Sequence, residues 1–122
     1  MSESIVRNKS KAFAVRIINL YKHLYHEKHE YVLSKQILRC GTSIGANICE
    51  ALCSMSKREF ISKLNISLKE AAKTEYWLEL LKETSFISEK EFESLNDDCN
   101  EVKSLLISII KTSNKSLDNS KL

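Results

Sequence analysis

The chain contains no proline, and its two glycines, Gly41 and Gly45, stand four residues apart. Without proline the chain has no strong internal stop signal, so long helices are expected. Each glycine costs a helix about 1 kcal/mol relative to alanine, and the expected return is a close approach between backbones. Alternatively, Gly41 ends one helix and another begins at Thr42 or Ser43, because glycine commonly follows a helix end.

Apolar residues recur at helical spacing in four segments of the sequence, which predict helices near residues 5–27, 31–54, 57–84 and 89–113. Two S-x-x-E sequences, Ser56–Glu59 and Ser88–Glu91, have the form of capping boxes and predict the starts of the last two helices. Residues 114–122 are expected to form a flexible tail. We therefore predict an all-α protein, in which one domain of residues 1–122 folds as a left-handed, antiparallel, up-down-up-down four-helix bundle.

The spacing also predicts which side chains face the core. In the second segment these are Leu33, Ile37, Gly41, Ile44, Ile48, Leu52 and Met55, and in the third Phe60, Leu64, Leu68, Ala71 and Leu78. The third segment carries a further apolar set on another side, which we expect at a subunit contact, because exposed apolar patches mark interfaces. This set comprises Ile66, Tyr76, Trp77, Leu80 and Leu81. Alternatively, the third helix is simply the most buried of the four.

Glu75 falls inside the apolar stripe of the third segment. A buried carboxylate needs a partner, or it is protonated. The candidate partners are Ser43, Asn47 and Arg39 in the second segment. Alternatively, the helix is rotated so that Glu75 reaches solvent at the edge of the bundle.

Positive charge is concentrated in the first half of the chain. Residues 1–63 hold 11 Lys/Arg and 5 Asp/Glu, a balance of +6, whereas residues 64–122 hold 8 and 11, a balance of −3. Basic side chains on a helical surface can neutralise phosphates, although many are merely solvated. No aromatic residues are interleaved with them, so base stacking is not indicated. The candidate nucleic-acid-binding residues are Arg7, Lys11, Lys22, Lys35, Arg39, Lys57, Arg58 and Lys63.

The sequence shows no arrangement of a nucleophile, a base and an oxyanion site, so we expect a protein that is not an enzyme and needs no cofactor. His23, His26 and His29 could offer nitrogen ligands, but they are more typical of a solvated helix end. Cys49 and Cys53 stand one turn apart, yet the four cysteines are not expected to converge on a metal. The chain has no long apolar run or secretory signal, which predicts a cytoplasmic protein with reduced thiols.

Three stretches, GTSIGANICEA, SKREFISKLNISLKEAAKTEYWLELLKE and LLISIIKTS, resemble a family of small bacterial four-helix-bundle proteins encoded in intervening sequences of large-subunit ribosomal RNA genes. The resemblance covers about residues 5–115 and also extends to the accessory variability determinant of diversity-generating retroelements. It implies a homopentamer with a basic surface for nucleic acid and no established enzymatic activity. The ribosomal label reflects gene location. Besides Gly41 and Gly45, the positions that match the polar motif of the family are Ser43, Asn47, Glu50 and Glu75.

Two functions follow from these observations. The first is a non-enzymatic, homo-oligomeric accessory protein that binds RNA or DNA through the basic residues. The alternative is a protein-binding scaffold without a nucleic-acid role, which the acidic stretch of residues 89–101 and the apolar surface around Trp77 both suggest.

Overall fold

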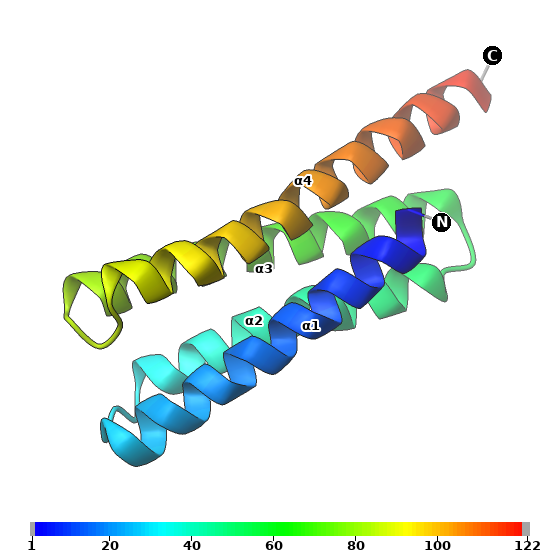
Figure 1. Cartoon of the computed structure of the whole chain (residues 1–122). Helices are drawn as coiled ribbons and strands as arrows, with labels where there is room; N and C mark the ends of the chain where they lie inside the picture. Colours follow the sequence, from blue (N-terminus) through cyan, green and yellow to red (C-terminus); the bar gives the residue numbers. More distant parts are fainter. Residues whose placement is uncertain (1, 121–122) are drawn as a thin grey trace.

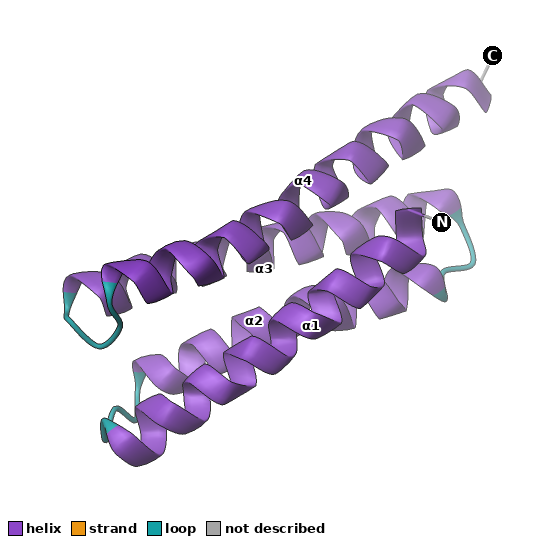
Figure 2. Cartoon of the chain, viewed as in Figure 1, coloured by secondary structure: helices purple, strands orange, loops and turns teal. Residues whose placement is uncertain are grey.

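The structure is a computed structural model that describes residues 2–120 (Figure 1). Within these residues the chain is helical and contains no strand (Figure 2), which confirms the all-α prediction. The elements are α1 (Ser2–Lys22), the short π-helix η1 (His23–Glu27), α2 (Leu33–Leu52), α3 (Lys57–Glu83) and α4 (Glu89–Ser120). No described helix combines the length and apolar character needed to cross a membrane.

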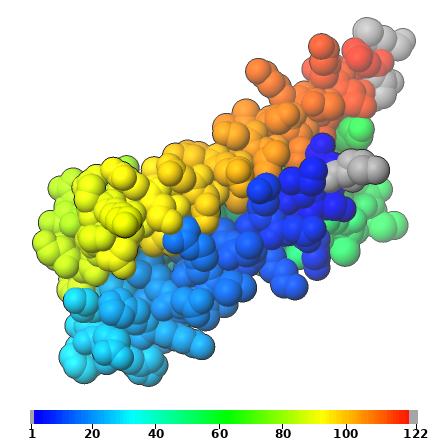
Figure 3. Space-filling model, in the orientation of Figure 1, coloured from blue at the N-terminus to red at the C-terminus, as the bar shows by residue number. Residues whose placement is uncertain are grey.

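The four α-helices lie side by side, and Figure 1 shows the chain turning back at each of the three connections. α1 packs against α2 and α4, and α3 packs against the same two helices. The space-filling view shows α1, in blue, against α4, in yellow and orange, along one face (Figure 3). One apolar core therefore runs between all four helices.

The core consists of branched apolar side chains from every helix, each contributing about 1.5–3 kcal/mol on full burial. Its largest fully buried side chains are Val6, Phe13, Ile17, Leu24, Ile37, Ile44, Ile48, Leu64, Leu78, Leu81, Val102 and Leu106. Two expected core residues are exposed instead, Leu52 by 41% and Met55 by 94%. α2 ends at Leu52 and Met55 lies in the following turn, so Ala51 takes the last core position of this helix.

α2 continues through both glycines, so the alternative that Gly41 ends a helix is wrong. A Cβ atom on Gly41 would lie 2.8 Å from Cγ2 of Ile17, and one on Gly45 would lie 3.1 Å from Oγ of Ser10. Both neighbours belong to α1. The glycines therefore allow a close crossing of α1 and α2 inside the subunit.

Serine and glutamate side chains cap the starts of α3 and α4, as the two S-x-x-E sequences predict. The Ser56 Oγ accepts a hydrogen bond from the Glu59 amide at 3.1 Å, and the Glu59 carboxylate accepts one from the Met55 amide at 3.0 Å. At α4, the Glu91 amide donates to Ser88 Oγ and the Ser88 amide donates to the Glu91 carboxylate. The hydrogen bond from the Ser88 backbone lowers the pKa of Glu91.

The start of α2 has a cap that no motif in the sequence predicted. The Glu30 carboxylate accepts hydrogen bonds from the backbone amides of Val32, Leu33 and Ser34, at 3.2, 3.0 and 2.6 Å. Burial acts to raise the pKa of Glu30, but these amides outweigh it and leave the pKa below its usual value. The carboxylate thus satisfies amides that have no partner inside the helix.

The last helix is longer than expected. α4 continues to Ser120, so the prediction of a flexible tail from residue 114 is wrong for residues 114–120, and residues 121–122 lie outside the described part. Ser113 is buried and Leu117 packs against the core, which extends the apolar stripe of α4 past its expected end. The Lys57 ammonium also donates to Ser116 Oγ at 3.0 Å and links α4 to the start of α3.

Candidate nucleic-acid interface

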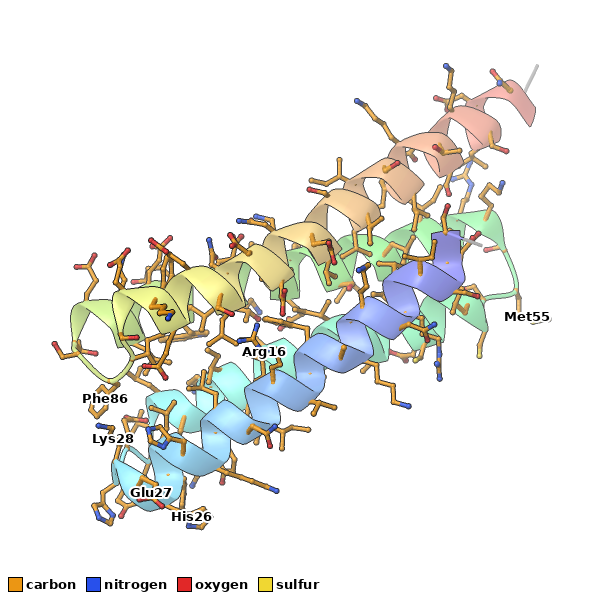
Figure 4. The ribbon with its side chains drawn as sticks, in the orientation of Figure 1. Arg16, His26, Glu27, Lys28, Met55 and Phe86 are labelled. Carbon is orange, nitrogen blue, oxygen red and sulfur yellow. The ribbon has the colours of Figure 1, made fainter. Side chains whose placement is uncertain are left out.

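The basic residues of α1 divide into two groups with different surroundings. Lys9 and Arg16 face α4, where Lys9 pairs with Glu101 at 2.7 Å and Arg16 with Asp98 at 2.6 Å. Figure 4 shows Arg16 between α1 and α4. Acidic residues of α4 therefore neutralise the cations on this side of α1 within the chain.

The other three cations of α1 are the candidates Arg7, Lys11 and Lys22. All three are exposed, and none forms a salt bridge within residues 2–120. Arg7 and Lys11 line a small groove of about 160 Å³ between α1 and α2. The opposite wall of this groove consists of small residues of α2, including Gly45 and Ala46. Two unneutralised cations thus stand beside an open, sterically accessible groove.

Lys35 and Arg39 extend the basic surface onto α2, and both are exposed and without a salt bridge in the described chain. The Lys35 ammonium lies 5.8 Å from the ring centre of Tyr25. Arg39 lines a larger groove of about 880 Å³ between α2 and α3, whose other side includes Tyr76 and Trp77. The fold therefore brings aromatic residues close to basic ones that are distant in sequence.

The last three candidates lie around the start of α3, and two of them are less available. Lys57 is bonded to Ser116 Oγ, and Lys63 is half-buried and lies 3.7 Å from the Glu50 carboxylate. Arg58 is exposed without a salt bridge among the described residues.

The eight candidates do not form one compact patch. The α1–α2 connection lies at one end of the bundle, and the N-terminus and the α2–α3 connection lie at the other (Figure 1). Lys22 and Lys35 are therefore near the first end and Arg7, Lys57 and Arg58 near the second. The candidates follow the length of the bundle, about 30 Å for a helix of this size.

The four polar residues matched by the family resemblance do not converge on one site. The Ser43 hydroxyl donates to the Arg39 carbonyl at 2.6 Å, and the Asn47 amide donates to the Ser43 carbonyl at 2.8 Å, so both are engaged inside α2. Glu50 is exposed beside Lys63. Glu75 lies elsewhere, on α3.

Glu75 is half-buried, and its carboxylate pairs with the ammonium of Lys103 on α4. The prediction that Glu75 pairs with Ser43, Asn47 or Arg39 of α2 is therefore wrong. α3 is rotated so that Glu75 faces its other neighbour, α4.

The predicted oligomer contact on α3 is only partly exposed. Ile66 and Tyr76 are 39% and 57% exposed, whereas Trp77 and Leu80 are half-buried and Trp77 packs against the core. Leu81 is fully buried, which contradicts its expected place at a subunit contact. Its side chain belongs to the stripe that packs inside the bundle.

The cysteines fall into an exposed and a buried pair. Cys49 and Cys53 are exposed, whereas Cys40 and Cys99 are buried. Burial raises the pKa of both buried thiols, that of Cys99 to about 12, so neither is a reactive thiolate at neutral pH. Among residues 2–120, no three His, Cys, Asp or Glu side chains are grouped so that they could hold a metal ion.

An aromatic cluster at the α1–α2 connection was not foreseen from the sequence. Tyr25 contacts the rings of two other tyrosines. The ring centres of Tyr21 and Tyr25 are 5.5 Å apart, and those of Tyr25 and Tyr31 are 4.8 Å apart. The ring centre of His26 lies 5.2 Å from that of Tyr25, and the His29 Nδ1 lies 3.0 Å from the Tyr31 hydroxyl oxygen. One candidate cation, Lys35, therefore stands beside an aromatic ring of this cluster.

A sequence model of the family described as 23S rRNA-intervening sequence protein matches residues 2–108. A protein of unknown function from the S23 ribosomal protein family of Bacteroides thetaiotaomicron VPI-5482, whose crystal structure is known, is 59% identical to the chain. The match covers 91% of this chain and 99% of that one, with a TM-score of 0.90. No curated protein matches the chain.

Proposed function

The chain belongs to the 23S rRNA-intervening sequence protein family, and from this premise we propose that it is a homo-oligomeric accessory protein that binds RNA or DNA without catalysing a reaction. The cations of the α1–α2 side contact the phosphates, and those that face α4 do not.

One observation carries this proposal, namely that the cations of α1 are neutralised on one side only. Lys9 and Arg16 are paired with acidic residues of α4, whereas Arg7, Lys11 and Lys22 are exposed without such partners in the described chain. A cation that is already paired gains little from a phosphate, because its pairing must first be broken. An exposed, unpaired cation releases phosphate counterions at no such cost. The unpaired residues are therefore the ones suited to bind nucleic acid.

The proposal includes an antiparallel, left-handed bundle, assembly as a pentamer and a place in the cytoplasm. The short connections between helices support the antiparallel order. The pentamer is supported by the family resemblance, and the exposure of Ile66 and Tyr76 supports a subunit contact on α3.

A protein-binding scaffold is the alternative function, and the exposed apolar Ile66 and Tyr76 favour it. Its second motive, the acidic stretch of residues 89–101, is weaker, because Asp98 and Glu101 pair with α1 and Glu89 lies 3.8 Å from Lys82. These carboxylates are partly neutralised within the chain and attract a basic partner less strongly.

Affinity capture of the tagged full-length protein from lysate, with and without nuclease, distinguishes the two functions. We expect nucleic acid in the untreated capture and loss of the co-captured proteins after nuclease. Partners that survive nuclease support the scaffold. Gel shifts with structured RNA and with DNA at low salt complete the test, and absence of any shift with the assembled protein refutes the proposal.

A further inference from the structure

The α1–α2 connection carries five rings in continuous contact, those of Tyr21, Tyr25, His26, His29 and Tyr31. They come from the last turn of α1, the π-helix and the loop that follows it. Figure 4 shows His26, Glu27 and Lys28 at this end of the bundle, opposite to Met55. The rings thus gather at one tip of the molecule.

Local backbone geometry explains how this short segment collects its rings. Tyr21 and Tyr25 are four residues apart and lie on one side of a helix. The π-helix His23–Glu27 widens the last turn, and His29 has a φ of 55°, which turns the chain back towards Tyr25. Tyr31 then meets Tyr25 edge-on, at an interplanar angle of 71°.

The outer rings of this cluster are accessible. Tyr31 is 47% exposed, and His26 and His29 are exposed, while Tyr21 and Tyr25 are half-buried beneath them. If the cluster served only to pack the turn, its rings would all be buried against the core. Here the half-buried rings support others that present surface to solvent.

The segment of residues 21–35 carries three lysines, of which Lys28 lies on the side of the α3–α4 connection, in a groove that Glu89 and Glu91 also line. Lys22, Lys28 and Lys35 are exposed and form no salt bridge in residues 2–120, and Lys35 lies over the ring of Tyr25. Of the two nearby carboxylates, Glu30 is engaged by three backbone amides of α2, and Glu27 remains exposed. The segment therefore combines aromatic surface with a net excess of available positive charge.

From this combination we propose that the tip formed by residues 21–35 is a stacking platform for the unpaired bases of single-stranded nucleic acid. An inserted base stacks on the exposed face of Tyr31, and Lys35, which lies over the neighbouring ring of Tyr25, contacts a flanking phosphate together with Lys22. The inference rests on the proposed function and narrows it to single strands. In a duplex both faces of a base are covered by its neighbours, so exposed rings favour unpaired bases.

The test compares binding of a short fluorescent oligouridylate and a short RNA duplex to the full-length protein at low salt, by fluorescence anisotropy. Tyr31→Leu removes the ring but keeps an apolar side chain. Tyr31→Phe keeps the ring and removes the hydroxyl that contacts His29. Val32→Ala is the matched control, because Val32 is 69% exposed in the same turn and carries no ring. Circular dichroism shows whether each variant keeps its helix content.

We expect Tyr31→Leu to weaken binding of the single strand by about 5- to 140-fold, which is typical for the loss of one stacked base. Duplex binding should change less than about twofold, and Tyr31→Phe and Val32→Ala should bind the single strand like the wild type. Three results overturn the platform: unchanged binding by Tyr31→Leu, equal losses for Tyr31→Leu and Tyr31→Phe, or equal losses for single strand and duplex. The proposed function survives all three, and it fails together with the platform only if the wild type binds neither probe.

Discussion

Replacing Gly41 with alanine should leave the protein less stable than the same replacement at Gly45. A Cβ on Gly41 would lie 2.8 and 2.9 Å from Cγ2 and Cγ1 of Ile17. Ile17 is fully buried, and its branched side chain cannot rotate away without disturbing the core. A Cβ on Gly45 would lie 3.1 Å from the Ser10 hydroxyl oxygen and 3.6 Å from Ser10 Cβ, so a shift of a few tenths of an ångström suffices there.

The magnitude follows from two opposing contributions. Both replacements put alanine for glycine in the interior of α2, which favours the helix by about 1 kcal/mol in each case. Overpacking at Gly41 costs about 1–3 kcal/mol. Because the propensity gain is common to both variants, Gly41→Ala should be about 1–3 kcal/mol less stable than Gly45→Ala.

A double-mutant cycle tests the cause of that difference. Ile17→Ala alone should cost about 2–5 kcal/mol, but it removes both γ-carbons that the new Cβ meets. The double variant Ile17→Ala/Gly41→Ala should therefore be about 1–3 kcal/mol more stable than the sum of the single effects predicts. Urea unfolding followed by circular dichroism at one fixed protein concentration measures all variants, since assembly makes stability depend on concentration. Equal stabilities of the two glycine variants, or additive effects in the cycle, would refute the close crossing.

Three further predictions concern the helix cap, the thiols and assembly. Glu30→Gln should lower the free energy of unfolding by about 0.5–2 kcal/mol at neutral pH, as for the loss of a helix cap. The folded-state pKa of Glu30 lies below the ordinary 4.5, so the stability difference between wild type and variant should be fully present above pH 4.5. It should disappear as the pH falls through the folded-state pKa. Urea unfolding at several pH values checks this. Under native conditions a thiol reagent should modify the exposed Cys49 and Cys53 quickly, whereas the buried Cys40 and Cys99 should react only on unfolding. Burial raises the pKa of Cys99 to about 12, which keeps its thiol protonated. Four fast-reacting thiols would contradict this burial. Ile66→Glu should leave the helix content unchanged but reduce the mass measured by light scattering, and an unchanged mass would exclude Ile66 from a subunit contact.

Much of the fold could be predicted from the sequence, because its signals are local. Helical periodicity predicted the four helices and core positions such as Ile37, Ile44 and Leu64, and the two capping sequences predicted where α3 and α4 begin. The pair Gly41 and Gly45 predicted a close crossing, since glycine inside a helix without proline needs a packing reason.

The errors arose where the three-dimensional rotation of a helix decides the outcome. The buried residues of α3 follow each other at spacings of three or four up to Leu78 and Leu81, so Leu81 continues the core stripe and its expected place at a subunit contact was a misreading of that spacing. Glu75 directly follows the buried Thr74, and the rotation of α3 decides that it faces Lys103 on α4 rather than α2. The sparse apolar positions after Ser113 gave too weak a pattern to predict that α4 continues.

The candidate site was the least predictable part. The basic residues could be identified from the sequence, but not which of them form salt bridges. The partners of Lys9 and Arg16 lie about eighty to ninety positions away in the sequence, on α4. The aromatic cluster depends on a π-helix and a positive φ, which have no sequence signature of their own.

The salt dependence of nucleic-acid binding tests the central claim most directly. The dissociation constant for the structured RNA used in the gel shifts would be measured over a range of salt concentrations for the wild type, for Arg7→Gln/Lys11→Gln and for the control Lys69→Gln/Lys111→Gln. The control removes the same charge from exposed lysines of α3 and α4 that form no salt bridge within residues 2–120. The logarithm of the binding constant falls linearly with the logarithm of the salt concentration, by about 0.7–0.9 for each phosphate contact. For Arg7→Gln/Lys11→Gln, which removes two contacts, this slope should become shallower by about 1.4–1.8. For the control it should stay unchanged. Equal changes in both variants, or no change in the first, would contradict an interface on the α1–α2 side.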